Sequence, residues 1–265
     1  MLRLLWNSQS TMTAQQEKLD AISNNIANVN TNGYKKLDAN FKDLVYESLD
    51  RKGYPVSTST TRKTVLQNGT GIRVGEWIRD KTQGQITSTG LKTDLAIDGT
   101  GYFEVTQLDN SKAYTRAGNF LTDANGTIVD QKGNRLSIVD GQGNNINKLN
   151  GPYKFDTNNF HVDSDGVVSI KQGNSEINVG KVKISNVIGD NSMMAVGDNL
   201  FIPKQGSTVV ESKDYSVMQG FLEQSNVDIA TEMTEMLVTQ RAFQLSSTTL
   251  KTADEMWQMA NNLRK

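Results

Sequence analysis

Acidic turn segments are the parts of this sequence whose residue types and spacing come nearest to a metal site. Asp163-Ser164-Asp165-Gly166 and Asp123-Ala124-Asn125-Gly126 resemble the first half of a calcium-binding loop. A complete loop places a bidentate Glu six residues after the glycine, between flanking helices. The residues at those positions are Gln172 and Lys132. Both segments therefore favour hairpin turns, and we expect no metal site.

Catalytic chemistry has little support in the remaining residues. The sequence has no cysteine, which excludes disulfides, thiolate metal sites and cysteine nucleophiles. Its single histidine, His161, lies between Phe160 and Val162, a setting that favours a strand residue over a catalyst. Gly99-Thr100-Gly101 lacks the third glycine and the following helix of a dinucleotide-binding motif. We therefore expect no enzyme and no cofactor.

Composition limits the classes of partner. The chain has 265 residues and a formal net charge of −1, with acidic and basic residues interspersed. This balance gives no electrostatic footprint for nucleic acid or an anionic membrane. The apolar runs are too short to span a bilayer, and the N-terminus lacks the apolar core of a signal peptide. We expect no nucleic-acid partner, no membrane insertion and no cleaved signal.

The distribution of helix-breaking residues divides the chain. All 22 glycines and all three prolines lie between Gly33 and Gly220, and both flanks have none. Since glycine and proline disfavour helix interiors, two helical ends enclosing a turn-rich middle are predicted. The first helix should end near residues 30–33, where Asn and Gly tolerate the left-handed conformation.

Both helical ends carry apolar residues at intervals of seven, the spacing of a supercoiled helix pair. A long core helix of a single globular domain is the alternative interpretation. The assembly seam predicted from this spacing has a main line and a second, weaker line on each helix. It comprises Leu5, Met12, Leu19 and Ile26 with Ile22 and Val29 on the first helix, and Ile229, Met236, Phe243, Leu250 and Trp257 with Met233 on the second.

The middle of the chain has a strand period. Short apolar runs such as 102–105 and 167–170 alternate with Asp98-Gly99, Asn125-Gly126, Asp140-Gly141 and Asp165-Gly166, which favour tight hairpin turns. The fold class predicted is mainly β with long N- and C-terminal α-helices that pair as a coiled coil, in elongated, discontinuous domains. The domains expected are residues 1–35 and 225–265 as paired terminal helices, 36–71 as an extended, Ser/Thr-rich linker or arm, and 72–224 as a β-rich outer domain.

Four segments, taken together, resemble flagellar axial proteins of the rod and hook family. They are residues 23–35, 95–103, 114–120 and 225–243. The residues that carry the resemblance are called the signature residues, and the four segments the signature segments. The signature residues are Asn24, Asn25, Asn28 and Gly33, then Asp98, Gly99, Gly101 and Phe103, then Arg116 and Gly118, and finally Asn226, Gln240 and Arg241.

The resemblance implies a structural subunit that polymerises with itself into a helical, hollow drive shaft. It implies export through the flagellar type III apparatus without a cleaved signal, and a place in the basal body within the cell envelope. Proximal rod and hook subunits are the implied neighbours, with peptidoglycan or ring proteins as further candidates. Length and ending are most like the distal rod members, whereas residues 50–71 differ from their pattern. The proximal rod or hook-type alternative therefore stays open.

Two alternatives come from other classes of protein. A secreted β-rich binding module with a coiled-coil stalk would need a face of exposed aromatic residues, and a glycan-binding screen would detect it. A wall-cleaving enzyme would use a pair of carboxylates, but the acidic residues here are scattered among turns. Lytic activity on peptidoglycan would reveal such an enzyme.

Overall fold

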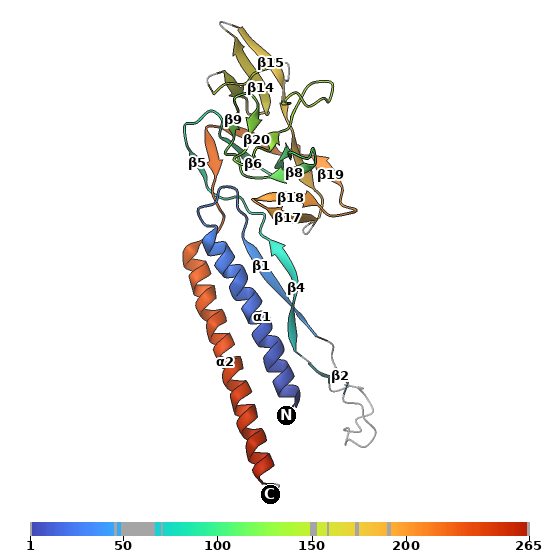
Figure 1. Cartoon of the computed structure of the whole chain (residues 1–265), viewed down its shortest axis with the longest axis vertical. Helices are drawn as coiled ribbons and strands as arrows, with labels where there is room; N and C mark the ends of the chain where they lie inside the picture. The colour runs from blue at the N-terminus through green and yellow to red at the C-terminus, as the bar shows by residue number, and fades with distance from the viewer. Residues whose placement is uncertain are drawn as a thin grey trace, which may run out of the picture. The chain divides into compact units, whose positions relative to one another are not determined.

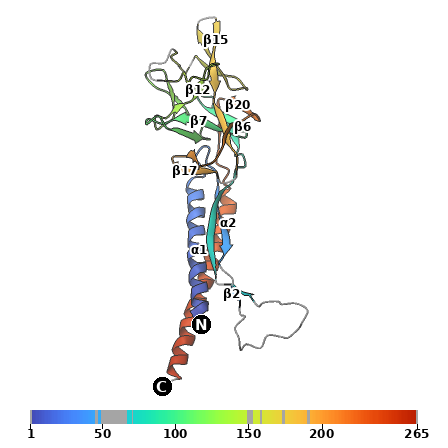
Figure 2. The same cartoon turned by 90° about the vertical axis from the view of Figure 1, so that its right-hand side faces the viewer.

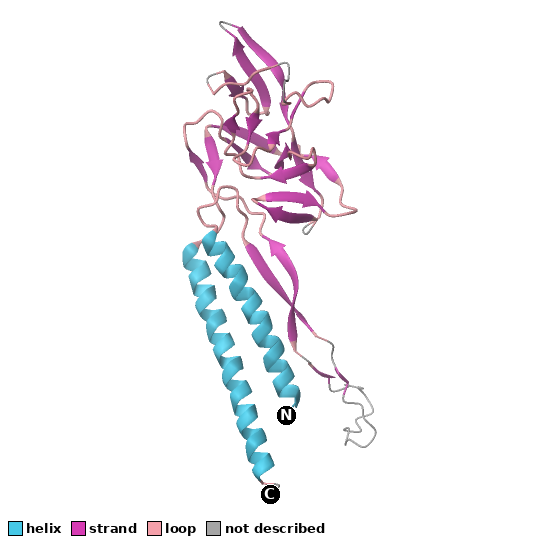
Figure 3. Ribbon diagram, in the orientation of Figure 1, coloured by secondary structure: helices cyan, strands magenta, loops and turns pink. Residues whose placement is uncertain are grey.

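The computed structural model describes residues 2–44, 47–48, 67–69, 71–148, 153–157, 159–172, 175–189 and 192–263. The fold is mainly β with one helix near each end of the chain, as predicted (Figure 3). The chain separates into two compact units. The first unit contains Met1–Ile26, Leu37–Ile78 and Ile229–Lys265, and the second contains Ala27–Lys36 and Arg79–Asp228. Residues 72–78, expected in the β-rich domain, thus fall in the first unit.

Two helices dominate the first unit. Helix α1 covers Leu2–Ala27 and helix α2 covers Ile229–Asn262, and they lie side by side in opposite directions (Figures 1 and 2). Helix α2 begins directly after Asp228, and Glu232 lies in its first turn, where the helix dipole favours an anion. Neither helix, over the residues described, has an apolar stretch of the length that a membrane crossing needs.

A β-ribbon completes the first unit. Strand β1 (Leu37–Asp43) pairs with β4 (Ile72–Arg79), and the short strand β2 (Glu47–Ser48) pairs with β3 (Gln67–Asn68). The segment expected to be a linker thus contributes three of these strands. Its Ser/Thr-rich tract at 57–63 lies outside the described residues.

The second unit consists of short strands. Its nine-stranded sheet has the order β17-β18-β8-β7-β11-β10-β9, with β16 pairing with β7 and β19 pairing with β16. A four-stranded sheet has the order β12-β15-β14-β13, and β20 pairs with β6 and β21 with β5. The bounds are β5 Ile86–Ser88, β6 Leu95–Gly99, β7 Tyr102–Thr106, β8 Lys112–Thr115, β9 Leu121–Thr122, β10 Ile128–Val129, β11 Arg135–Leu136, β12 Ile138–Val139, β13 Phe160–Val162, β14 Val167–Gln172, β15 Ser175–Val182, β16 Ile184–Val187, β17 Met193–Gly197, β18 Leu200–Pro203, β19 Val209–Glu211, β20 Tyr215–Gln219 and β21 Phe221–Glu223.

Buried apolar residues from both larger sheets form one core in the second unit. Phe103 and Phe120 are fully buried and meet edge to face, with their ring centroids 5.5 Å apart. Phe155 and Phe160 form a similar pair at 6.0 Å. This edge-to-face arrangement is favourable because the positive ring edge meets the negative ring face. Of the signature residues, Phe103 therefore acts through packing.

The predicted hairpin turns at Asn125-Gly126 and Asp165-Gly166 are confirmed, because they join the antiparallel pairs β9–β10 and β13–β14. The hairpin predicted at Asp98-Gly99 is wrong, because β6 pairs with β20 and not with β7. Gly99, Gly126 and Gly166 have φ values of 106°, 76° and 78°. The Gly166 N–H donates to the Asp163 carbonyl at 2.8 Å, which closes the turn between β13 and β14. In the turn of Asp140-Gly141, the positive φ falls on Gly143 instead.

The turn after α1 ends at Gly33, which has a φ of 69°. Helix α1 itself ends at Ala27, earlier than the predicted end near residues 30–33, because residues 28–33 form turns instead of a last helical turn. The Gly33 N–H donates to the Glu223 carbonyl at 2.8 Å. A Cβ atom on Gly33 would lie 2.5 Å from the backbone nitrogen of Ala117. The chain therefore passes here through a gap that only glycine fits.

We predict that Gly33→Ala destabilises the second unit by more than the cost of the φ angle alone. Gly90→Ala is the matched control, because Gly90 has a similar φ of 73° and open space around its Cα. The left-handed conformation costs about 1–3 kcal/mol for a residue other than glycine, and the clash adds to it only in Gly33→Ala. Urea unfolding of both variants measures the difference. Equal losses of stability would show that the contact with Ala117 relaxes freely.

Candidate functional site

The residues of the predicted seam differ in how far they are buried within one chain. On the α1 side, Ile22 is buried, and Leu5, Met12, Leu19, Ile26 and Val29 are half-buried. On α2, Met236, Phe243 and Leu250 are half-buried, whereas Ile229, Met233 and Trp257 are 43%, 53% and 49% exposed. The single chain thus leaves much of this apolar surface in water. The seam stays a prediction that concerns the assembled state.

The residues that α2 buries within the chain are small or polar. They are Glu232, Thr239 and Ala253, which are separated by seven and fourteen residues. The Thr239 hydroxyl donates to the Glu235 carbonyl within the helix at 2.7 Å. The Glu232 carboxylate accepts a hydrogen bond from Asn25 on α1 at 3.1 Å. The buried line follows the apolar line by three residues, so the two lines lie side by side on one face of α2.

A second group of apolar residues on α2 is more exposed than the seam. Leu237 and Val238 are each 64% exposed, and Leu245 is 68% exposed. Several large apolar side chains exposed on one helix favour an interface, because exposing them to water is unfavourable. The surface of α2 is thus suited to contacts outside its own chain.

Asn25, one of the signature residues, joins three segments of the first unit. Its side chain is buried, and its Oδ1 accepts from the Leu37 N–H at 2.9 Å. Its Nδ2 donates to the Leu37 carbonyl at 2.9 Å and to Glu232 at 3.1 Å. One amide therefore fixes the start of β1 and the first turn of α2 against α1. A second cross-helix contact is the ion pair between Lys18 and Glu235, at 3.4 Å.

We predict that Asn25→Ala loosens the first unit. The substitution removes three hydrogen bonds and leaves Glu232 buried without the amide, at a cost of about 1–3 kcal/mol. Circular dichroism at 222 nm should show helix melting at a lower temperature than in the parent chain. Asn24→Ala is the control at an exposed neighbour. Equal melting of the two variants would argue against this role of Asn25.

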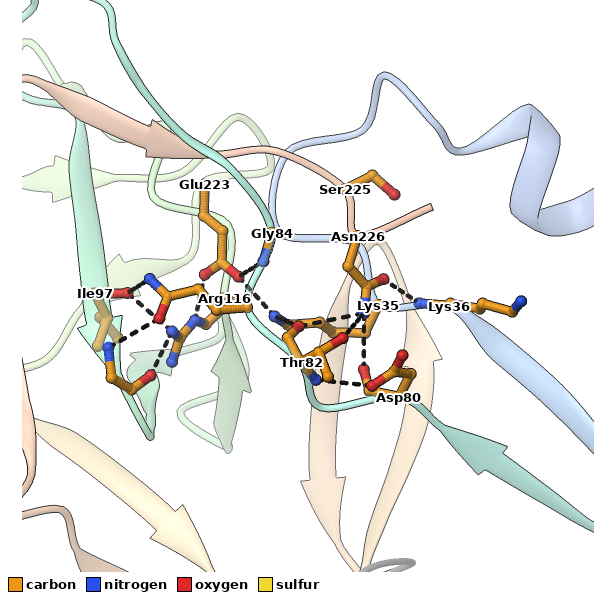
Figure 4. A network of polar contacts seen from close by, with 12 residues as sticks. Lys35, Lys36, Asp80, Thr82, Gly84, Ile97, Arg116, Glu223, Ser225 and Asn226 are labelled. Carbon is orange, nitrogen blue, oxygen red and sulfur yellow. Dashed lines mark hydrogen bonds and ion pairs between the residues drawn. The ribbon is translucent and has the colours of Figure 1, made fainter. Parts of the chain in front are cut away.

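Arg116 is the centre of a buried polar network in the second unit (Figure 4). Its Nη2 donates to the carbonyls of Ile97 and Gly99 at 2.8 and 2.7 Å, and its Nη1 donates to the Gly101 carbonyl. Its Nε donates to Glu223 at 2.5 Å. The guanidinium thus holds the turn at residues 97–101, which contains three of the signature residues.

Glu223 receives a second cation from another segment. The Lys35 ammonium lies 2.6 Å from Glu223 Oε1 and donates to the Thr82 carbonyl at 2.7 Å. Glu223 Oε1 also accepts from the Gly84 N–H at 2.9 Å. The side chains of Lys35 and Glu223 are 4% and 0% exposed, so water contributes little screening. Burial lowers the pKa of Lys35, and the hydrogen bond with Glu223 opposes this shift.

Asn226 extends the network to the backbone of Lys36, Asp80 and Thr82. Its Oδ1 accepts from the Lys36 N–H at 2.7 Å, and its Nδ2 lies 3.2 Å from the carbonyls of Asp80 and Thr82 (Figure 4). Gly118 supports the same region, because a Cβ atom there would lie 1.6 Å from the Leu95 carbonyl oxygen. The network therefore explains most of the signature residues outside the helices.

Some signature residues take no part in these networks. Gln240 and Arg241 are exposed on α2, where Arg241 donates to Gln244 at 3.0 Å. Asn28 is half-buried in the turn after α1. The Asn28 side chain accepts a hydrogen bond from the Thr31 hydroxyl at 3.1 Å, whereas Gln240 and Arg241 are placed for contacts on the surface of α2.

Sequence reasoning missed two residues of the network, Lys35 and Glu223. Lys35 lies within the first signature segment, so the resemblance could have selected it. Glu223 gave none, because a glutamate between a strand and a linker is ordinary on a protein surface.

His161, the histidine considered above as a candidate for catalysis, is a strand residue. His161 lies in β13, as predicted, and its Nδ1 lies 2.9 Å from Gln219 Oε1. Throughout the described ranges, no three His, Asp or Glu side chains gather as metal ligands do. The arrangement of charged groups thus serves to hold backbone segments together.

Three family models match the chain. Their descriptions are "Flagella basal body rod protein" over residues 5–35, "Flagellar hook protein FlgE/F/G D1 domain" over residues 96–170, and "Flagellar basal body rod FlgEFG protein C-terminal" over residues 218–263. The chain is therefore of the class of flagellar rod and hook proteins.

Curated relatives narrow the class. The "Flagellar basal-body rod protein FlgG" of Borreliella burgdorferi is 37% identical over 273 residues, which cover 100% of both chains. The protein of the same name in Bacillus subtilis is 36% identical over 275 residues, again with 100% of both chains covered. This chain belongs to the flagellar basal-body rod protein family.

Proposed function

We propose that the chain is a structural subunit of the bacterial flagellar basal-body rod, of the distal type, without enzymatic activity. Copies of the chain polymerise into a helical, hollow shaft that transmits torque and conducts exported subunits. The full-length similarity to basal-body rod proteins of several bacteria supports this function.

One structural observation supports the proposed self-assembly. Helix α2 buries Glu232 and Thr239 within the chain but exposes Leu237, Val238 and Leu245. A helix that buries its polar line and exposes its apolar residues lowers its free energy when a further surface covers them. In a rod, this surface belongs to neighbouring copies.

The remaining parts of the proposal follow from the same assembly. The apolar lines of α1 and α2 form the coiled-coil seam of an axial core of the shaft. The partners are further copies of the chain, proximal rod and hook subunits and the type III export apparatus, with peptidoglycan or ring proteins around the rod.

The distal assignment rests on degree of similarity. The relatives named as FlgG rod proteins are 34–37% identical to this chain. The "Flagellar hook-basal body complex protein FlhP" of Bacillus subtilis also matches over 100% of both chains, but at 28% identity. The gap in identity favours the rod subunit over other axial subunits.

Electron microscopy of basal bodies from a deletion strain tests the function. We expect an axis that ends within the envelope and carries no hook. The length at which it ends separates a distal from a proximal subunit. An intact rod and hook in this strain would contradict the proposal.

A further inference from the structure

We infer that the C-terminal end of α2 from one copy docks in a groove of a second copy, between α1 and the β1–β4 ribbon. This inference rests on the proposed function and names the contact that joins successive copies. The two surfaces that meet both belong to the first unit.

The end of α2 has no α1 beside it. Asn25 of α1 contacts Glu232 of α2, and the helices run in opposite directions. Both helices rise about 1.5 Å per residue. Leu2, the first residue of α1, lies 23 residues before Asn25, so it lies level with Glu255, which lies 23 residues after Glu232 on α2. The residues of α2 after Glu255 therefore continue past α1, as Figures 1 and 2 both show.

This overhang, residues 256–263, is amphipathic. Met256, Met259 and Leu263 follow the i, i+3, i+7 spacing of one helix face and are 42%, 58% and 88% exposed. Gln258 and Asn261 lie on the opposite face. Helices that bind in grooves use this spacing of apolar anchors, and methionine adapts to irregular surfaces.

The groove lies beside the N-terminal half of α1. It has a volume of about 440 Å³, and its apolar lining consists of Trp6, Ala14, Leu44, Ile72 and Val74. Trp6 is 66% exposed, so its indole is available to a partner. The volume is of the size that takes a few large side chains.

The chemistry of both surfaces points to a second copy as the occupant. The groove lining holds one cation, Arg73, on the ribbon and one carboxylate, Glu17, on α1. Glu255 precedes the apolar anchors on α2, so an incoming helix that lies along the ribbon brings its carboxylate to Arg73. The overhang runs beyond the first turn of its own α1, away from its own groove at Trp6–Glu17. Because overhang and groove are different surfaces, each docked copy leaves one of each free. Contacts of this heterologous kind build open helical polymers.

Disulfide cross-linking in isolated basal bodies tests the contact. The parent chain has no cysteine, so every cross-link arises from an introduced one. One strain produces two variants of the chain together, Thr13→Cys in the groove and Met259→Cys on the overhang. The matched control pairs Thr13→Cys with Gln258→Cys, which lies on the opposite helix face. Met256→Cys replaces Met259→Cys where the latter does not enter rods.

After mild oxidation, we expect a covalent dimer of twice the chain mass of 29.2 kDa in the Thr13→Cys and Met259→Cys mixture. Rods that contain only one variant should give none, and the Gln258→Cys mixture should give much less. Rods that contain both chains without a dimer would overturn the docking and leave the rod function standing. Absence of the parent chain itself from isolated rods would overturn the proposed function.

Discussion

Leu245→Asp is expected to abolish rod assembly and motility while the free chain stays folded. Leu245 is 68% exposed in the single chain, so the carboxylate stays in water there and the free energy of unfolding changes little. In the rod, the same position would be covered by a neighbouring copy. Burying a leucine contributes about 1.5–3 kcal/mol, and burying a carboxylate without a partner costs several kcal/mol. The loss recurs at every copy along the shaft.

The matched control is Gln244→Asp, which adds the same charge at the next residue of the same helix turn. Asp at this position keeps an acceptor for Arg241, which donates to Gln244 in the parent chain. Motility in soft agar and electron microscopy of basal bodies compare the two variants. Normal rods in the Leu245→Asp strain would remove this face of α2 from the assembly interface.

The two helices were predictable from the sequence because their signals are local. The absence of glycine and proline from both ends of the chain depends on no distant contact, and neither does the seven-residue apolar spacing. Asp228 marked the start of α2, whereas the Asn- and Gly-containing segment at 30–33 placed the end of the first helix a few residues after Ala27, where α1 ends. Helix propensity and capping act within a few residues, so these boundaries followed from neighbours in the sequence.

The strand boundaries were less predictable because strand pairing is not local. The apolar run at 182–184 reads as one strand, but Val182 ends β15 in the four-stranded sheet and Ile184 begins β16 in the nine-stranded sheet. Likewise, residues 37–43 carry no clear alternation, yet they form β1 because Ile72–Arg79 lies beside them. Partners far along the chain decide such pairs.

The site was only partly predictable for the same reason. Apolar spacing predicted a seam on α2 but not the buried line of Glu232 and Thr239, whose residue types are typical of exposed positions. The resemblance selected Arg116, but nothing in the sequence tied it to Glu223, 107 residues away. A buried ion pair becomes visible only when the fold brings both partners together.

Glu223→Gln is expected to destabilise the second unit strongly. Glu223 is the carboxylate shared by the Lys35 ammonium and the Arg116 guanidinium, at 2.6 and 2.5 Å. Its side chain is 0% exposed, so the substitution leaves two cations in a site that water does not reach. Removing one partner of a buried ion pair costs about 3–5 kcal/mol. In a unit of this size, each kcal/mol of lost stability lowers the melting temperature by about 2–4 °C, so we expect a shift of roughly 10 °C. Differential scanning calorimetry of the purified chain measures this shift.

Comparison with Lys35→Met separates the charge effect from simple loss of contacts. Lys35→Met removes the cation whose pKa burial lowers, and it leaves Arg116 and Glu223 as a neutral pair. It should therefore cost less than Glu223→Gln, although both variants lose the contact between Lys35 and Glu223. Glu211→Gln, at an exposed position in β19, controls for the change of residue type and should leave the melting temperature close to that of the parent chain. A larger fall in melting temperature in Lys35→Met than in Glu223→Gln would contradict this account. Glu223 would then act mainly as an anchor for Lys35, and the balance of two cations on one carboxylate would not be what stabilises the network.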